Sequence, residues 1–181
     1  MMTCKGMLLV LSVIALTSCA GPVVNERAPD RVLVGTTVVL QQDLAVPAGH
    51  ARVFLQQGMV VEKHRLEPSL PHCNFEQRTL SNGSAVIKAD HFKVTAVSVG
   101  EDMVVQRDCE SMLPVGRNEP GGSDCVDKVN RYINHQLSSP SQPQVMRLTC
   151  HGGFNVPGRA QLPGLADIRT ALGGVATLEL P

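Results

Sequence analysis

Two pairs of neighbouring residues, His72-Cys73 and Cys150-His151, are the side chains of this 181-residue sequence best suited to chemistry. Thiolate and imidazole groups are suitable ligands for Zn²⁺ or Cu(I), and free thiols can also exchange with disulfides. If Cys73 and Cys150 lie close together in the fold, both histidines lie close as well. The four residues therefore form one candidate metal or redox site, which requires the two thiols to be reduced.

The spacing of these residues favours a structural role over a metal site. It matches no CxxC or HxxxH pattern of known ligand geometry. Neighbouring residues on a strand point to opposite faces, so a histidine beside a disulfide most often lies only at the surface of a sheet. We therefore expect no metal ion and no other cofactor, and keep the site of His72, Cys73, Cys150 and His151 as an alternative.

Two disulfides are expected in the folded part of the chain, because four cysteines in an oxidising compartment are typical of two bridges. Three connectivities are possible. Residues 110–124, between Cys109 and Cys125, are rich in Gly, Pro and Ser, so a bond there would close a flexible loop. Cys73 and Cys150 both lie in strand-like sequence. We therefore predict one bond between Cys73 and Cys150 and one between Cys109 and Cys125.

Patterns for nucleophilic catalysis are weak. Residues 149–153, Thr-Cys-His-Gly-Gly, could be mistaken for a thiol nucleophile with an oxyanion turn, but a disulfide at Cys150 removes the nucleophile. The sequence has no G-x-S-x-G elbow, and residues 121–123, Gly-Gly-Ser, lack the Lys of a phosphate loop. We therefore expect a protein that is not an enzyme. An envelope hydrolase is the second alternative, and it requires a pocket that holds an acid, base or nucleophile with a perturbed pKa.

The N-terminal residues have the layout of a signal peptide. Lys5 precedes an apolar run over residues 7–16, and small polar residues follow directly before Cys19. The run is too short to span a bilayer, which needs ~20 apolar residues. The tetrad Leu-Thr-Ser-Cys at residues 16–19 resembles the lipobox of bacterial lipoproteins, in which the cysteine is lipidated and becomes the new N-terminus. This resemblance makes residues 1–18 the signal peptide and Cys19 the lipidation site.

A lipidated Cys19 would hold the protein on a membrane through its acyl chains, since each buried CH₂ contributes about 0.8 kcal/mol. Ala20, in place of Asp, resembles the pattern that is sorted to the outer membrane. Residues 19–30 contain Gly and Pro and predict a lipidated tether. We therefore expect an outer-membrane lipoprotein, acylated with palmitate and facing the periplasm. An ordinary secretory signal cleaved near Ala20 is the alternative.

Charge and composition argue against two classes of function. Without residues 1–18 the chain has 163 residues, with 15 basic and 16 acidic side chains, which argues against a nucleic-acid surface. The sequence has four Phe, one Tyr and no Trp, so sites that stack sugars or bases on aromatic platforms are also disfavoured. The length fits one domain, which we place at residues 31–181.

Hydrophobic patterning predicts a mainly β domain, a small antiparallel sandwich or barrel-like fold with a short C-terminal helix, stapled by disulfides. Asn82-Gly83 is the strongest hairpin signal and predicts that the strand before it pairs with the strand after it. Gly100 predicts a turn between two strands. The helix is predicted at residues 165–172, ended by Gly173. Strands are predicted at residues 31–40, 51–56, 73–80, 85–88, 92–99, 103–106, 129–138, 145–150 and 175–180.

The order of several segments resembles that of uncharacterised Gram-negative envelope lipoproteins. The resemblance covers most of the chain after the signal peptide and implies no activity. Its segments are residues 46–54, 72–76, 139–145 and 168–173. With the lipobox, it leads us to expect a non-catalytic interaction or assembly accessory, attached to the membrane through its lipid and in contact with another envelope protein.

Overall fold

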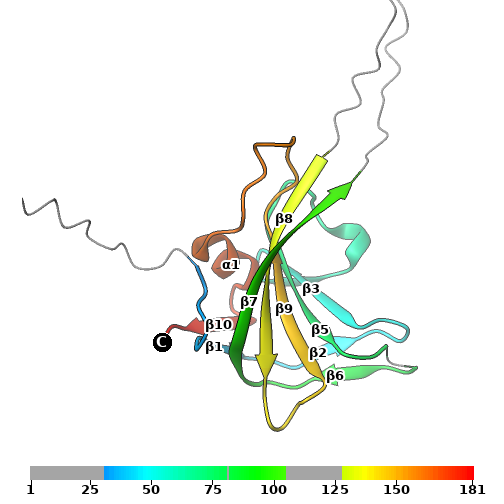
Figure 1. Ribbon diagram of the computed structural model, residues 1–181. Coiled ribbons are helices and arrows are strands. Elements are labelled where there is room, and N and C mark those ends of the chain that lie inside the picture. Colours follow the sequence, from blue (N-terminus) through cyan, green and yellow to red (C-terminus); the bar gives the residue numbers. More distant parts are fainter. Residues whose placement is uncertain (1–30, 81, 105–127) are drawn as a thin grey trace, which may run out of the picture.

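A computed structural model describes residues 31–80, 82–104 and 128–181 of the chain. The fold is mainly β, as predicted, with one short α-helix near the C-terminus (Figure 1). The elements are β1 (Thr37–Leu40), β2 (Leu44–Val46), β3 (Arg52–Gln56), β4 (Met59–Val61), the 3₁₀ turn η1 (Lys63–Arg65), β5 (His72–Gln77), β6 (Ala85–Ile87), β7 (Asp90–Val104), β8 (Lys128–Ser138), β9 (Val145–His151), α1 (Leu165–Leu172) and β10 (Ala176–Glu179).

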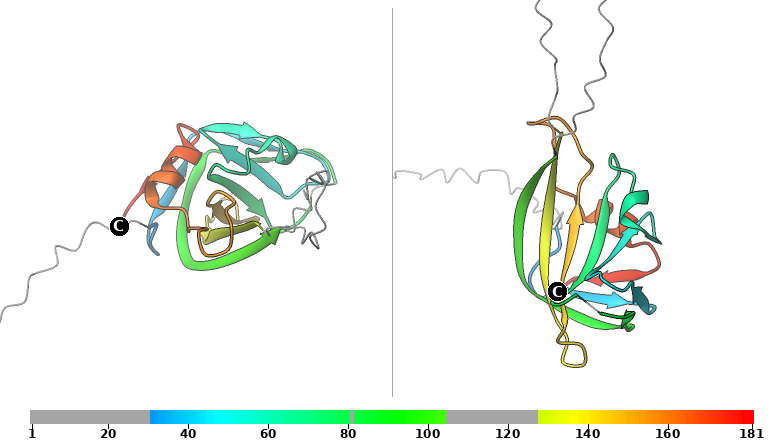
Figure 2. Two further views of the ribbon diagram at one scale, coloured as in Figure 1. Left: turned by 90° about the horizontal axis from the view of Figure 1, so that it is seen from above. Right: turned by 90° about the vertical axis from the view of Figure 1, so that its right-hand side faces the viewer.

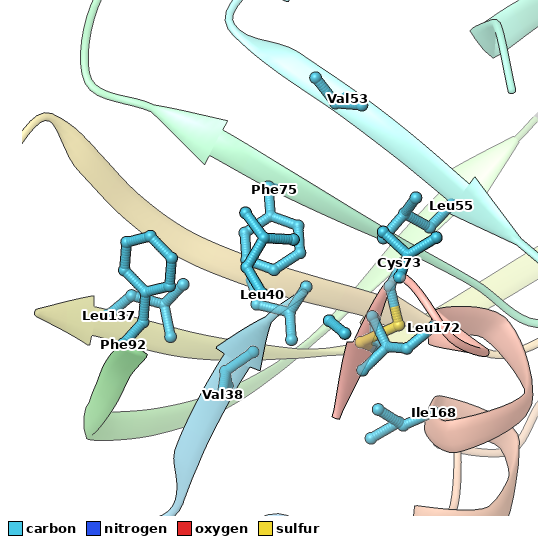
Figure 3. Packing of buried hydrophobic residues seen from close by; sticks show 14 of the residues in the cluster. Val38, Leu40, Val53, Leu55, Cys73, Phe75, Phe92, Leu137, Ile168 and Leu172 are labelled. Carbon is cyan, nitrogen blue, oxygen red and sulfur yellow. A yellow bond between two sulfur atoms is a disulfide. The ribbon is translucent and has the colours of Figure 1, made fainter. Parts of the chain in front are cut away.

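Eight of the strands form one antiparallel sheet in the order β10-β1-β7-β8-β9-β5-β3-β4. Val38 and Leu40 of β1 share one buried cluster with Leu55 of β3, although four strands separate β1 from β3 in the sheet (Figure 3). Such contact requires the sheet to curl around the cluster. The result is a half-barrel, with a core face inside the curl and an outer face on the other side.

Helix α1 lies where the curl would otherwise be open (Figure 2). It contacts β3 and β5 on one side and β10 on the other, and its buried residues, Leu165, Ile168, Ala171 and Leu172, join the core. Gly173 ends the helix with φ +53°, a backbone conformation that disfavours other residues. The predicted helix and its terminating glycine are thus confirmed. The small β2–β6 sheet adds Leu44, Val46 and Ile87 to the same core.

The turn between β3 and β4 packs directly on the end of α1. The Gly58 N–H donates to the carbonyl oxygen of Ala171 at 3.0 Å. A Cβ atom on Gly173 would lie 2.4 Å from the Gly58 Cα atom, so this approach needs glycine. The contact joins one end of the curled sheet to the helix that also touches the other end.

The turn predicted at Gly100 is wrong, because one strand, β7, runs from Asp90 to Val104. Gly100 pairs with Tyr132 of β8, and a Cβ atom on Gly100 would lie 2.3 Å from the Tyr132 Cζ atom. The glycine therefore leaves room for the tyrosine ring. A bulge between Val94 and Ala96 also shifts the alternation, so Val94 and Val97 both point to the core face.

The hairpin predicted at Asn82-Gly83 is also wrong. Strand β5 is hydrogen-bonded to β3 on one side and to β9 on the other, so it offers no free edge to β6. Strand β6 pairs instead with β2, with Leu44 opposite Ile87. The hairpin predicted between residues 129–138 and 145–150 is confirmed as β8 and β9.

Candidate functional site

The Cys73–Cys150 disulfide expected from the sequence is present. Cys73 on β5 lies directly opposite Cys150 on β9, with 4.0 Å between their Cα atoms, and both side chains are buried on the core face. The bond closes a sequence separation of 77 residues. The lipidation site Cys19 and the predicted Cys109–Cys125 pair lie outside the described residues.

The alternative metal site of His72, Cys73, Cys150 and His151 does not have the geometry of a metal centre. The two cysteines point to the core face and are bonded to each other, whereas their histidine neighbours point to the outer face. Strand alternation therefore keeps the four side chains from converging on one ion. No group of three or more potential ligands that could hold a metal is found in the described part of the chain.

The two histidines form a stacked pair on the outer face. His72 lies opposite His151, and their rings are parallel within 4°, with centroids 4.6 Å apart. His151 Nδ1 lies 3.2 Å from the side-chain oxygen of Asn130, and its ring also contacts Tyr132. Burial lowers the pKa of His72, and burial together with the nearby His72 and Arg52 lowers that of His151 to about 3. At neutral pH both rings are uncharged, as close stacking of two imidazoles requires.

Two further rows of polar side chains cross the outer face beside the histidine pair. In the first, the Thr149 hydroxyl donates to the Asn134 side-chain oxygen at 2.7 Å. In the second, Glu76 accepts hydrogen bonds from Arg52 at 3.2 Å and from Arg147 at 2.6 Å. These rows satisfy one another's polar groups across neighbouring strands. The groups of these two rows therefore have partners, whereas the buried His72 Nδ1 and Asn74 Oδ1 on the same face have none among the described residues.

The Glu76 carboxylate is held in its charged form. Burial raises its pKa, but hydrogen bonds and charge from Arg147 and Arg52 outweigh that effect and bring the pKa below its usual value. Glu76 is thus committed to two ion pairs, which leaves it a poor general acid at neutral pH.

The glycines of the sequence Cys150-His151-Gly152-Gly153 have a packing explanation. A Cβ atom on Gly152 would lie 2.3 Å from the carbonyl oxygen of Gln161, and one on Gly153 would lie 2.2 Å from that of Ser69. Two loops therefore approach the backbone at this point. The resemblance to a thiol nucleophile with an oxyanion turn is accounted for by this packing and by the disulfide.

A cluster around Asp90 was not predicted from the sequence. One oxygen of its carboxylate accepts hydrogen bonds from the hydroxyls of Ser139 and Ser141 and from the Gln142 side chain. These bonds lower the pKa of Asp90, with Ser139 making the largest contribution. The Gln142 amide in turn bonds both backbone groups of Lys88. The cluster fixes the β8–β9 turn against the start of β7.

A buried histidine, His135, was also missed. It is 0% exposed on the core face of β8, opposite Leu148, and its Nδ1 donates to the Leu148 carbonyl oxygen at 3.2 Å. A carbonyl only accepts, so the proton resides on Nδ1 and the bare Nε2 faces the core. That Nε2 has no partner among the described residues. Burial lowers the pKa of His135 to about 4, which the Leu148 hydrogen bond only partly opposes.

A pocket of about 720 Å³ lies beside β3 where β4 ends. Its wall is mainly apolar and its rim carries several cationic side chains. None of the described residues that line it bears a hydroxyl or thiol group. They are Ala45, Pro47, His50, Arg52, Val53, Phe54, Val60, Val61, Glu62, Lys63 and His64.

Comparisons with protein-family models, with curated proteins and with solved structures found no match to this chain. The part of the chain that the structure describes contains no helix long and apolar enough to cross a membrane. Function therefore has to be argued from the surfaces and the pocket of this fold.

Proposed function

We propose that this chain is a non-catalytic lipoprotein, anchored through Cys19 on the periplasmic side of the outer membrane, that binds another envelope protein. The observation that supports binding is an apolar strip on β7, formed by Val97, Val99 and Met103 and interrupted only by Glu101, which pairs with Arg131. Their side chains are 37%, 58% and 66% exposed. Exposed apolar groups gathered on one strand face are typical of a protein contact.

The position of this strip explains why a protein would suit it. Val97 and Val99 point to the core face, and the residues opposite them on β8, His135 and Ile133, are fully buried. The core includes Phe92 and Val94 at the start of β7, but beside Val97 and Val99 it ends at β8. A partner side chain placed on the strip would continue an apolar layer that already exists, which makes the contact more favourable than one on an isolated patch.

Further apolar surface lies where the chain enters the domain. Leu33 and Val34 are exposed, and the next residue, Gly35, donates its N–H to the Val94 carbonyl of β7 at 2.9 Å. The proposed tether, residues 19–30, precedes this point directly. A partner bound to β7 would therefore be held close to the membrane that carries the anchor.

Lipidation is tested with a Cys19→Ala variant. We expect the variant to lose all label after growth with radioactive palmitate, because Cys19 is the proposed acylation site, and to migrate as the longer, uncleaved chain. A Cys4→Ala variant is the matched control, since Cys4 lies within the proposed signal peptide, and it should keep both the label and the cleavage. Labelling that survives the loss of Cys19 would refute the anchor.

Binding through β7 is tested with Val99→Lys, compared with Ser98→Lys on the opposite face of the same strand. Both positions are exposed, so each variant should keep its melting temperature within about 2 °C. The measurement is the amount of partner protein that is chemically cross-linked to this chain in cells and recovered with it. We expect Val99→Lys to reduce this amount at least tenfold, because a charge would be buried in the contact. Ser98→Lys should leave recovery unchanged. Equal effects of the two variants would contradict the proposed surface.

A further inference from the structure

The pocket beside β3 has the size and wall of a small-molecule site. Its volume, about 720 Å³, falls within the range of about 300–1,000 Å³ typical of ligand pockets. It occupies the place where β4 would continue along β3, because β4 pairs only with Phe54 to Gln56 and the chain then turns into η1. The half of β3 that begins at Arg52 therefore borders a hollow in place of a neighbouring strand.

Apolar residues from three elements line this hollow. Phe54 comes from β3, Val60 and Val61 from β4, and Ala45 from β2. Val60 is 50% exposed, and the wall is continuous with the core through the buried Val53. A hydrocarbon group would remove this wall from water.

The rim carries two cationic side chains against one carboxylate, Glu62. Arg52 and Lys63 both line the pocket. Arg52 shares one carboxylate, Glu76, with Arg147, while Lys63 has no ion-pair partner in the described part of the chain. The pocket's own carboxylate, Glu62, lies 3.4 Å from His64 at the exposed rim. Lys63 is therefore a rim cation whose charge is not taken up by an ion pair in the described part of the chain, and the nearby Glu62 pairs with His64.

We infer that this pocket binds a small anionic amphiphile, a single alkyl chain against the apolar wall whose carboxylate or phosphate contacts Lys63 and Arg52. A neutral chain would gain only the apolar contact, and a headgroup without a chain would gain only a solvent-exposed charge contact, which is weak. A ligand that has both an alkyl chain and an anionic headgroup would make both contacts. The inference goes beyond the proposed function and does not depend on the strip on β7.

The test uses the full chain carrying Cys19→Ala, purified without detergent. Binding is measured by isothermal titration calorimetry, with each amphiphile kept below the concentration at which it forms micelles. Decanoate, decyl phosphate and decanol are the probes. We expect one site per chain for both anions, with the tighter anion identifying the headgroup. In the series octanoate, nonanoate and decanoate, affinity should rise about fourfold per methylene. Decanol should bind more weakly than either anion.

Variants separate the two halves of the site. Lys63→Gln should weaken both anions about fivefold and leave decanol unchanged, because only the charge contact is lost. Lys93→Gln removes the same charge from β7, outside the pocket, and should change nothing. Val60→Asn should weaken decanoate and decanol alike.

Three results would overturn the inference: no binding of either anion, decanol binding as tightly as decanoate, or equal effects of Lys63→Gln and Lys93→Gln. None of them would bear on the palmitate label at Cys19 or on the cross-linking at Val99. Failure of the amphiphile site and failure of the proposed function are therefore distinguishable.

Discussion

Removal of the Cys73–Cys150 disulfide is expected to lower the free energy of unfolding by about 4 kcal/mol. The bond closes a separation of 77 residues, and its loss frees the unfolded chain to explore many more conformations. Cys73 and Cys150 are both buried and lie opposite each other on β5 and β9, so the bond joins the two strands within the core. This cost is a large fraction of the roughly 5–15 kcal/mol that stabilises a typical domain.

Urea unfolding of the Cys73→Ala and Cys150→Ala variants, alone and combined, measures this effect. Either single substitution breaks the bond, so the double variant should be little less stable than each single one, in contrast to the additive loss of two independent side chains. A loss below about 1 kcal/mol, or simple additivity, would show that the bond does not constrain the chain as argued.

Acid is expected to destabilise the domain well above the pH at which carboxylates become protonated. His135 has a pKa of about 4 in the folded protein, against 6.5 for an unperturbed histidine. Between these values the unfolded chain binds a proton that the folded chain excludes, so stability is full above pH 6.5 and falls as the pH decreases toward 4. For His135 alone the loss amounts to about 3 kcal/mol. His72 and His151, whose pKa values are also lowered, act with the same sign.

The carboxylates contribute in a lower range of pH. The pKa of Glu76 is lowered from 4.5 and that of Asp90 from 3.8, so each adds stability that is present above those values and lost as the pH falls below them. The interval from pH 6.5 to 4.5 therefore isolates the histidines.

The contribution of His135 is measured by urea unfolding of a His135→Leu variant at about pH 7 and about pH 4.5. Leucine cannot take up a proton, so the variant should lose about 2 kcal/mol less stability than the parent protein across this interval. A His91→Asn variant, altered at an exposed histidine on β7, should follow the parent. If His135→Leu and His91→Asn give the same profile as the parent, His135 is not the group that titrates.

Local sequence signals predicted the elements whose partners are close in the chain. The spacing of Leu165, Ile168 and Leu172 identified α1, and the turn-rich connector before Val145 identified the β8–β9 hairpin. Pairing between distant strands left no such signal. Asn82-Gly83 predicted a local hairpin, but both edges of β5 are occupied, one by β3 from shortly before it and the other by β9 from far later in the chain.

Some of the candidate site residues were also predictable from the sequence, and others were not. Pairing of Cys73 with Cys150 was predictable because both lie in clear strands. The Asp90 cluster was not, because Ser139, Ser141 and Gln142 are about fifty residues away and match no motif. His135 did have a signal, since it alternates with Ile133 and Leu137, which places it on the core face once β8 is accepted as a strand. The pocket beside β3 exists because β4 is short, and no pattern in the sequence predicts where β4 ends.

Pairing of β1 with β10 has a consequence for how the protein is made. Thr37 lies opposite Glu179, so the edge of β1 that pairs with β10 cannot be covered until residue 179 has been synthesised. Until then β1 presents an open edge on which a strand of another nascent chain can pair. Premature termination near residue 175 would leave that edge open permanently, so such fragments should aggregate or be degraded rather than persist as partly active protein.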